Sequence, residues 1–245
     1  MNDMRIVAII QARMASSRLP GKVLMDLAGE PVLVRCVNRI CRARSINEIV
    51  VATTSKPADD AILNLCRQKN WPCFRGSEED VLDRFYHTAI KWRADLVVRI
   101  TSDCPLIEPI IVDQVVQDFL KRQPKVDYVS NFLPPRTFPR GLETEVIGLN
   151  VLERAWREDQ NPAWREHVTP YIYKNPALFQ IYSVTHARDY SHMRWTVDTS
   201  EDLDFVRRIY DHFGQDLFSW EEVLALLEVH PEWLEINRHV QQKVI

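Results

Sequence analysis

A chain of 245 residues is long enough to bury roughly 70–75 % of its unfolded surface, so it can fold without disulfides or a structural metal. Hydrophobic residues make up 46 % of it and charged residues 27 %, which excludes a disordered, collagen-like or coiled-coil protein. The net charge of −3 argues against a nucleic-acid or membrane-surface protein. We therefore expect a soluble globular protein that forms one domain over residues 1–245.

Cysteine usage and the N-terminal sequence indicate the compartment. The five cysteines are odd in number and contain no Cys-x-x-Cys pair, which argues against a disulfide framework or a zinc knuckle, so we expect them reduced and mostly buried. The apolar run Ile6–Ile10 is too short for a signal peptide or a membrane span. These features predict a cytoplasmic protein without a membrane partner.

Strands and helices alternate along the first half of the chain. Arg5–Ile10 is almost continuously apolar, as in a strand that is covered on both faces of a parallel sheet. Pro31–Ala43 then has apolar residues at helical spacing, with proline in the first turn. The next predicted elements are a strand at Ile49–Ala52, a helix at Pro57–Lys69, a strand near Cys73, a helix at Val81–Trp92, a strand at Leu96–Ile100, a helix at Val112–Leu120 and an extended segment at Asp127–Ser130. This order predicts an α/β fold with a mostly parallel sheet and helices on both sides.

The pattern is less regular after residue 134. A proline-rich loop, Leu133–Gly141, precedes segments that are predicted to be extended and that could form an antiparallel or mixed edge of the same sheet: Thr144–Ile147, Phe179–Val184 and Met193–Val197. The predicted helices of this half are Val151–Glu158, Arg165–Tyr173, Glu201–Phe213 and Glu221–Val229. Asp198 or Thr199 is expected near the N-cap of the helix Glu201–Phe213.

The loop after the first strand carries positive charge where α/β proteins bind ligands, beyond the carboxyl ends of the strands. Gln11–Lys22 contains three cations and no acid, but it has neither a Walker nor a G-x-G-x-x-G pattern. A triphosphate could be met by free backbone N–H groups together with the side chains of Arg13, Ser16, Ser17, Arg18 and Lys22. From charge content alone, a solvated basic loop is an equally good interpretation.

The same loop, IIQARMASSRLPGKVL, resembles the signature of the sugar-nucleotide cytidylyltransferases, the group that includes acylneuraminate and KDO (deoxy-manno-octulosonate) cytidylyltransferases. Further segments match in order, and they are most similar to the spore coat polysaccharide branch: GSEEDVLDRFY, VVRITSDCPLIEP, PRGLETEV, REHVTPYIY and RWTVDTSEDL. The resemblance implies a nucleotide-diphospho-sugar transferase fold, GT-A-like and Rossmann-like, with α/β/α layers around a mostly parallel mixed sheet. It also implies a Mg²⁺-dependent reaction with CTP that releases pyrophosphate.

Two aspartates follow predicted strands. Asp103 comes soon after the strand Leu96–Ile100, and Asp198 follows the extended segment Met193–Val197. By position alone each could be a turn or helix-cap residue, although two carboxylates suffice for Mg²⁺, which also takes water and substrate phosphates as ligands. The resemblance implies that both aspartates bind the metal. Asp202 is expected to be a first-turn carboxylate that the helix dipole favours.

The resemblance also implies roles for other residues. Catalytic roles fall to Arg13, Lys22 and Asp103, with charge stabilisation and alignment instead of a covalent protein nucleophile. Nucleotide contacts are implied for Gln11, Ala12, Arg13, Ser16, Ser17, Arg18, Lys22, Asp83, Arg84 and Thr101, although Arg84 could equally be an ordinary helical ion-pair residue. The acceptor is expected beside loops or helix starts of the second half, at Arg140, Glu143, Glu145, Arg165, Glu166 and His167, each of which could alternatively be a surface or structural residue.

The sequence thus predicts a Mg²⁺-dependent nucleotidyltransferase that transfers CMP from CTP to a sugar acid or related acceptor, for polysaccharide or glycoconjugate biosynthesis. Thr101-Ser102 stand where the KDO enzymes carry Gln-Gly, which argues against KDO itself as the acceptor. Two alternatives remain open: a GT-A-type glycosyltransferase that uses a nucleotide-sugar, and a non-catalytic nucleotide-binding regulatory subunit.

Two expectations concern the chain as a whole. Its nucleotide-binding half is predicted over residues 1–130, and its acceptor-binding and C-terminal helical half over residues 131–245. A homodimer is expected, with no nucleic-acid partner. The apolar side chains of the last third either lie between subunits or complete the core: Trp220, Leu224, Leu227 and Trp233.

Overall fold

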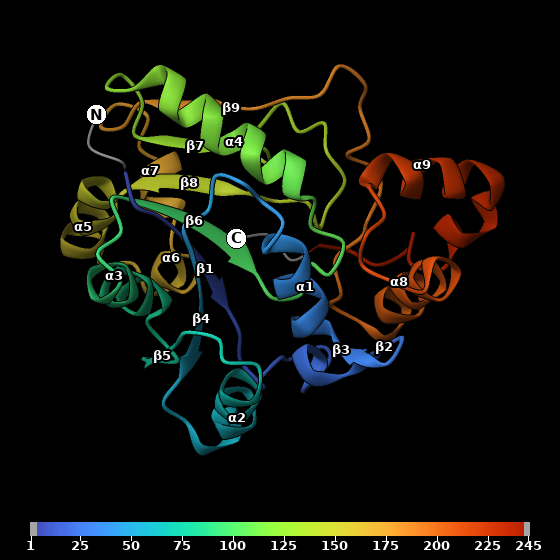
Figure 1. Ribbon diagram of the computed structural model, residues 1–245. Coiled ribbons are helices and arrows are strands. Elements are labelled where there is room, and N and C mark those ends of the chain that lie inside the picture. The colour runs from blue at the N-terminus through green and yellow to red at the C-terminus, as the bar shows by residue number, and fades with distance from the viewer. Residues whose placement is uncertain (1–3, 243–245) are drawn as a thin grey trace.

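The computed structural model describes residues 4–242 as a seven-stranded sheet with helices on both faces (Figure 1). The strands of this sheet are β1 (Ile6–Gln11), β4 (Glu48–Thr54), β5 (Cys73–Gly76), β6 (Leu96–Thr101), β7 (Tyr128–Ser130), β8 (Glu145–Gly148) and β9 (Ile181–Ser183). A small separate ribbon pairs β2 (Asp26–Leu27) with β3 (Glu30–Pro31). The helices are α1 (Val32–Ile40), α2 (Asp60–Gln68), α3 (Val81–Lys91), α4 (Pro109–Arg122), α5 (Leu149–Glu158), α6 (Pro162–His167), α7 (Pro170–Tyr173), α8 (Ser200–Phe213) and α9 (Trp220–Val229).

The strand order is β5-β4-β1-β6-β8-β7-β9. β1 pairs in parallel with β4 and β6, β4 pairs in parallel with β5, and β9 runs parallel to β7. β8 pairs antiparallel with both β6 and β7. These pairings confirm the predicted mostly parallel sheet with a mixed edge. Because β1 and β6 are parallel neighbours, the loops that follow them leave the same edge of the sheet.

The burial of β1 explains why helices cover both faces of the sheet. Its residues Ile6–Ile10 are all buried, and they alternate between two apolar cores. Ala8 and Ile10 face the core that includes α1, α2, α4, α8 and α9, whereas Val7 and Ile9 face the core that includes α3, α5 and α7. This α/β/α layering confirms the predicted fold class.

The strand predicted at Met193–Val197 is wrong. The segment makes a parallel bridge between Arg140 and Arg194 but no continuous ladder. Its backbone hydrogen bonds go to two different segments. Arg140 N donates to Met193 O at 2.9 Å, and Val197 N donates to Asp103 O at 2.8 Å. The strand-like pattern of this segment therefore reflects burial of a connecting segment, not a place in the sheet.

The helix predicted at Arg165–Tyr173 is interrupted. α6 ends at His167 and α7 begins at Pro170. Val168 has a φ of 70°, outside the helical region, and Pro170 has no N–H with which to continue a helical ladder. The other predicted helices and strands are confirmed to within a few residues at their ends.

The C-terminal helices belong to the main core. Trp220 and Leu227 are buried, and Leu224 and Trp233 pack against the same cluster. These four residues therefore complete the core, which is one of the two positions predicted for them. The cysteines are free, and Cys36, Cys66 and Cys104 are buried. Within residues 4–242, no helix has the length and apolar character needed to cross a membrane.

A buried arginine ties α1 to the segments that precede α4 and α9. Arg39 is fully buried, and its guanidinium donates to Glu108 Oε2 at 3.2 Å, to Ile107 O at 2.7 Å, and to Asp216 O and Phe218 O, each at 3.0 Å. Glu108 is also buried. A buried ion pair of this kind is costly to break on one side, because the remaining charge is left without compensation.

Arg39→Met is expected to lower the free energy of unfolding by about 3–5 kcal/mol, because Glu108 would remain buried without its cation. Urea unfolding followed by circular dichroism would measure the loss. Arg42→Met is the matched control on the same side of the molecule, since the exposed Arg42 also donates to Asp216 O. A loss no larger for Arg39→Met than for Arg42→Met would contradict the structural role of the buried pair.

Candidate active site

The loop after β1 is fixed by its own backbone and by a neighbouring acid. Met14 O accepts from Gly21 N at 2.9 Å, and Met14 N donates to Asp59 Oδ1 at 2.7 Å. Gly21 has a φ of 72°, a left-handed conformation that favours glycine, and it precedes a short 3₁₀ helix, Lys22–Leu24. This turn places Lys22 at the edge of the sheet where β6 ends.

Lys22 lies at the centre of the candidate site. Its ammonium nitrogen Nζ donates to Asp103 Oδ2 at 2.7 Å, to Asp198 Oδ1 at 2.8 Å and to Val197 O at 2.8 Å. Only 10 % of its side chain is exposed. Burial acts to lower the pKa of Lys22, but the two carboxylates outweigh burial and the pKa is raised, so the ammonium stays charged at neutral pH.

Asp103 follows β6 and is bonded to the segment that carries Asp198. Asp103 O accepts from Val197 N at 2.8 Å and from Thr196 Oγ1 at 3.1 Å. These bonds bring the two aspartates together although they are far apart in the sequence. Burial acts to raise the pKa of Asp103, but the charge and hydrogen bond of Lys22 outweigh it and the pKa is lowered. Asp103 is therefore an ionised carboxylate at neutral pH.

Asp198 is surrounded by cations. Its Oδ1 accepts from Lys22, while its Oδ2 is 2.7 Å from Arg18 and 2.7 Å from Arg194. Four residues predicted for the site are thus brought into one cluster by the structure: Arg18, Lys22, Asp103 and Asp198. We call these four the Lys22 cluster.

The donor set of the Lys22 cluster fits a divalent cation. The ammonium shows that oxygens of Asp103 and Asp198 converge on one position that already holds a positive charge. Mg²⁺ takes one or two protein carboxylates and fills its other positions with water and phosphate. Across residues 4–242, no group of three or more His, Cys, Asp or Glu side chains gathers as a metal site. A metal here would therefore need substrate oxygens to complete its coordination.

Arg13 lies in the same loop but pairs elsewhere. Its guanidinium is 3.0 Å from Glu166 Oε1, and the two side chains are 36 % and 46 % exposed. Glu166 belongs to α6, so this ion pair joins the loop after β1 to the second half of the chain. The exposure of both groups means that a competing anion can reach Arg13 without crossing a buried contact.

Arg84 is not the helical ion-pair residue that one interpretation proposed. It is buried on α3, and its Nη1 donates to Ser77 O instead of to a carboxylate. Burial, followed by repulsion from Arg13, lowers the pKa of Arg84 to about 10. The residue therefore fixes the turn before α3. Gln11, at the end of β1, has a buried Oε1 without a partner among the described residues.

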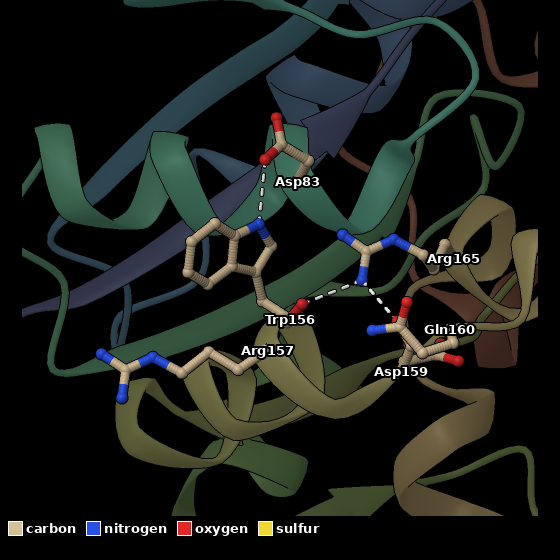
Figure 2. A pocket seen from close by; sticks show the side chains of 6 residues that line it. All are labelled: Asp83, Trp156, Arg157, Asp159, Gln160 and Arg165. Atoms are coloured by element: carbon tan, nitrogen blue, oxygen red, sulfur yellow. Dashed lines mark hydrogen bonds between the residues drawn. The ribbon is translucent and has the colours of Figure 1, made fainter.

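Two predicted site residues lie in a different hollow. A cavity of about 500 Å³ is lined by Asp83, Trp156, Arg157, Asp159, Gln160 and Arg165. Figure 2 shows Arg165 turned toward the backbone of α5, where its Nη1 donates to Trp156 O and Asp159 O, each at 2.9 Å. Trp156 Nε1 donates to Asp83 Oδ1 at 2.9 Å. No residue of the Lys22 cluster lines this cavity. Asp83 and Arg165 therefore lie apart from the Lys22 cluster.

Glu145 lies in β8, in agreement with the extended segment predicted at Thr144–Ile147, and not in one of the loops or helix starts expected to hold the acceptor. It is buried, and it accepts from Arg99 Nη1 and, at 2.7 Å, from Tyr128 Oη. The antiparallel register of β6 and β8 puts Arg99 directly opposite Glu145, which explains the pairing. The Glu145 carboxylate is therefore already engaged by two side chains of the sheet.

The remaining predicted acceptor residues lie in loops or at a helix end. Arg140 is half-buried, and Glu143 accepts from Arg136 Nη2 and, at 2.6 Å, from Gly141 N. His167 ends α6, and burial is the main cause that lowers its pKa, so the imidazole is neutral at pH 7. A neutral imidazole can both donate and accept a hydrogen bond.

Sequence analysis missed the arginines that neutralise these carboxylates: Arg99, Arg136 and Arg194. Arg194 stands in the segment RWTVDTSEDL, four residues before Asp198, and the two side chains form an ion pair although this segment is not helical. Arg99 and Arg136 gave no signal in the sequence, since their pairing depends on strand register and on the course of a loop.

The chain is similar in sequence and in fold to known proteins. Residues 7–228 match a family model described as cytidylyltransferase. The chain belongs to the cytidylyltransferase family. It is 34 % identical over 244 residues to the spore coat polysaccharide biosynthesis protein SpsF of Bacillus subtilis, over 95 % of this chain and 97 % of that protein. It is 39 % identical over 115 residues to a 3-deoxy-manno-octulosonate cytidylyltransferase of Geobacter sulfurreducens, over 46 % of this chain and 44 % of that protein.

A solved structure covers the whole fold of this cytidylyltransferase. A cytidylyltransferase from Leptospira borgpetersenii is 30 % identical and superposes with a TM-score of 0.91 over 99 % of both chains. The resemblance that the motifs indicated is confirmed. The protein is thus a nucleotidyltransferase enzyme, and the glycosyltransferase and non-catalytic alternatives lose their support.

Glu166→Gln is expected to leave the Tm of the cytidylyltransferase within about 2 °C, because an exposed ion pair contributes only about 0–1 kcal/mol. Freed from Glu166, Arg13 can turn to phosphate, so the KM for CTP should fall by about twofold to threefold. Steady-state kinetics with CTP would measure it. Glu158→Gln removes the exposed pair with Arg154 and should change neither quantity. A higher KM in Glu166→Gln would contradict this role of the pair.

Proposed function

We propose that this cytidylyltransferase transfers CMP from CTP to a sugar acid, with release of pyrophosphate. The family supports the nucleotide, and one similar protein carries 3-deoxy-manno-octulosonate, a sugar acid, in its name. Another carries spore coat polysaccharide biosynthesis in its name, which supports a role in making a surface polysaccharide or glycoconjugate.

The observation that carries the proposal is the Lys22 cluster itself. Two carboxylates and two cations meet at the edge of the sheet where β1 and β6 end. Attack of an acceptor oxygen on the α-phosphorus of CTP spreads negative charge over phosphate oxygens, and no covalent protein nucleophile is required. Preorganised cations at that position lower the barrier because they need no reorganisation as the charge develops.

Lys22 has the central role in this proposal. In the absence of nucleotide its ammonium forms ion pairs with both aspartates. When CTP binds, Lys22 exchanges these carboxylates for phosphate oxygens, and Asp103 and Asp198 become available to hold Mg²⁺. Held by these two carboxylates, Mg²⁺ would supply neutralisation of the phosphate charge. Arg13 and Arg18, from the same loop, add positive charge around the triphosphate.

The acceptor is proposed to lie between this cluster and α6. Arg140, Glu143, Glu166 and His167 supply charges of both signs together with a neutral imidazole. Such a set suits an acceptor that carries hydroxyl groups and an acid group. Because Glu145 is held by Arg99 and Tyr128, we assign it to the floor of this region and not to direct acceptor binding.

A pyrophosphate-release assay tests the proposal. The enzyme would be incubated with Mg²⁺, one of the four ribonucleoside triphosphates, and one of several sugar acids that include 3-deoxy-manno-octulosonate and N-acetylneuraminate. We expect release only with CTP and with at least one sugar acid, and a product whose mass equals that of the acceptor plus CMP. Equal release with UTP, or with no acceptor at all, would count against it.

Several expectations stay predictions. The division into a nucleotide-binding half, 1–130, and an acceptor-binding half, 131–245, stays a prediction, with Asp198 as a proposed contribution of the second half to the nucleotide site. We also propose that the enzyme works as a homodimer in the cytoplasm. Light scattering of the purified protein would test the homodimer. Cell fractionation, with the enzyme detected by an antibody, would test the cytoplasmic location.

A further inference from the structure

The C-terminal segment of the chain reaches the side chains that hold Asp198. Asn237 is only 3 % exposed, and its Nδ2 donates to Asp202 Oδ1 and to Arg194 O, each at 2.9 Å. Near the end of the described chain, Gln242 Oε1 accepts from Arg194 Nη1 at 2.7 Å. Figure 1 shows the described chain after α9 running back from α9 toward the middle of the view. The segment therefore contacts the candidate site from outside the family motifs.

Asp202 links this segment to Asp198. It is fully buried, and its Oδ2 accepts from the backbone N–H groups of Asp198 at 3.0 Å and Thr199 at 3.1 Å. Its two oxygens also accept from Arg194, at 2.8 and 3.0 Å. The same Arg194 donates to Asp198 Oδ2 at 2.7 Å. Asp202 thus fixes both the backbone of Asp198 and the guanidinium that orients its carboxylate.

Asn237 supplies a further hydrogen bond to the Asp202 carboxylate. The Asp202 Oδ1 atom has two donors, Arg194 Nε and Asn237 Nδ2, and the loss of either would leave a buried carboxylate oxygen with one fewer hydrogen bond. The second bond of Asn237, to Arg194 O, ties the backbone of that arginine to the same point. Without this amide, the Arg194–Asp202 pair loses one of the contacts that define its position.

We propose that Asn237 is a positioning residue, which acts through Asp202 and Arg194 to hold the Asp198 carboxylate where its Oδ1 converges with Asp103 Oδ2, and thereby strengthens divalent-cation binding at the site. This inference rests on the proposed metal-binding role of Asp103 and Asp198. Outer hydrogen bonds of this kind typically change metal affinity by about 10–100-fold, because they orient the ligating group. Asn237 is one contact further out, so the lower end of that range is expected.

Calorimetric titration of CTP, once with Mg²⁺ and once with EDTA, tests the proposal without any turnover. The ratio of the two dissociation constants reports what the metal contributes to CTP binding. Asn237→Ala is expected to reduce this ratio by about tenfold and to leave the dissociation constant in EDTA within about twofold. Asn237→Asp keeps the side-chain shape but places a carboxylate against Asp202, so it should lose at least as much. A role in packing alone would be rescued by the aspartate.

A control variant and a second test variant distinguish a positioning role of Asn237 from a general loss of structure. Asn131 is also a buried asparagine, with bonds to Leu142 O and Thr144 N, and Asn131→Ala should leave the ratio unchanged. If Asn237→Ala does not fold, Arg194→Lys keeps the charge without the double contact and should show the same tenfold loss. A wild-type ratio in Asn237→Ala or Arg194→Lys overturns the inference. A ratio that Asp198→Ala leaves intact instead refutes the metal role on which it rests.

Discussion

Replacing Lys22 with alanine is expected to lower the turnover of CTP by about 10²–10³-fold, since a preorganised group that stabilises developing negative charge is worth about that much. The variant should also be less stable, by about 2–3 kcal/mol, because Asp103 would lose its cation and would face Asp198, which keeps only Arg18 and Arg194. This value is below the loss for a fully buried pair, since 22 % of the Asp103 side chain is exposed. Steady-state kinetics and urea unfolding measure the two effects, and added Mg²⁺ should restore part of the stability.

Lys69→Ala is the matched control for Lys22. Lys69 also pairs with a carboxylate, Glu30, at 3.0 Å, but both side chains are exposed and lie in a surface contact. Its removal should change neither turnover nor stability measurably. Turnover of Lys22→Ala within about threefold of the wild type would show that the charge-stabilising role assigned to Lys22 is wrong.

Asp103→Asn and Asp198→Asn are each expected to lower turnover by about 10²–10⁴-fold, because the charge stabilisation that a catalytic metal supplies is worth several kcal/mol. The double variant should lose little more than either single variant, since both carboxylates are proposed to hold one cation and their effects are not additive. Kinetics over a range of Mg²⁺ concentrations would separate a weaker metal site from a slower reaction. A metal defect raises the Mg²⁺ concentration that gives half-maximal rate.

Asp204→Asn provides the control for these two variants. Asp204 lies on α8, a few residues after Asp198, and its side chain is 63 % exposed. Its neutralisation should leave both the rate and the Mg²⁺ dependence unchanged. A rate for Asp103→Asn that matches the rate for Asp204→Asn would contradict the proposed metal site.

Much of the fold could be predicted from local sequence patterns. The continuous apolar run of β1, the helical spacing of α1 and the alternation of strands and helices depend on burial and periodicity, which are visible in a single sequence. The same patterns misplaced Met193–Val197. A buried connecting segment with Trp195 and Val197 in the core has the apolar content of a strand, and only its backbone partners distinguish the two.

The candidate site could be predicted less completely than the fold. The positions of Lys22, Asp103 and Asp198 after strands, together with motif resemblance, predicted residues that do meet in space. The partners of the carboxylates could not be predicted from the sequence. They depend on strand register, as for Arg99 and Glu145, or on distant segments, as for Asn237. Glu145 is an example, since nothing in the sequence indicated that its carboxylate pairs with Arg99 and Tyr128 within the sheet.

The most direct test of the central claim, that the Lys22 cluster binds CTP with a divalent metal, is a thermal shift of the purified protein with each of the four ribonucleoside triphosphates, with and without Mg²⁺. A ligand at about 100 times its dissociation constant adds about 2.7 kcal/mol of stability, which corresponds to several degrees for a chain of this size. We predict a shift with CTP and Mg²⁺ that is largely lost in Asp103→Ala. Equal shifts with all four nucleotides, or a CTP shift that Asp103→Ala leaves intact, would contradict the account.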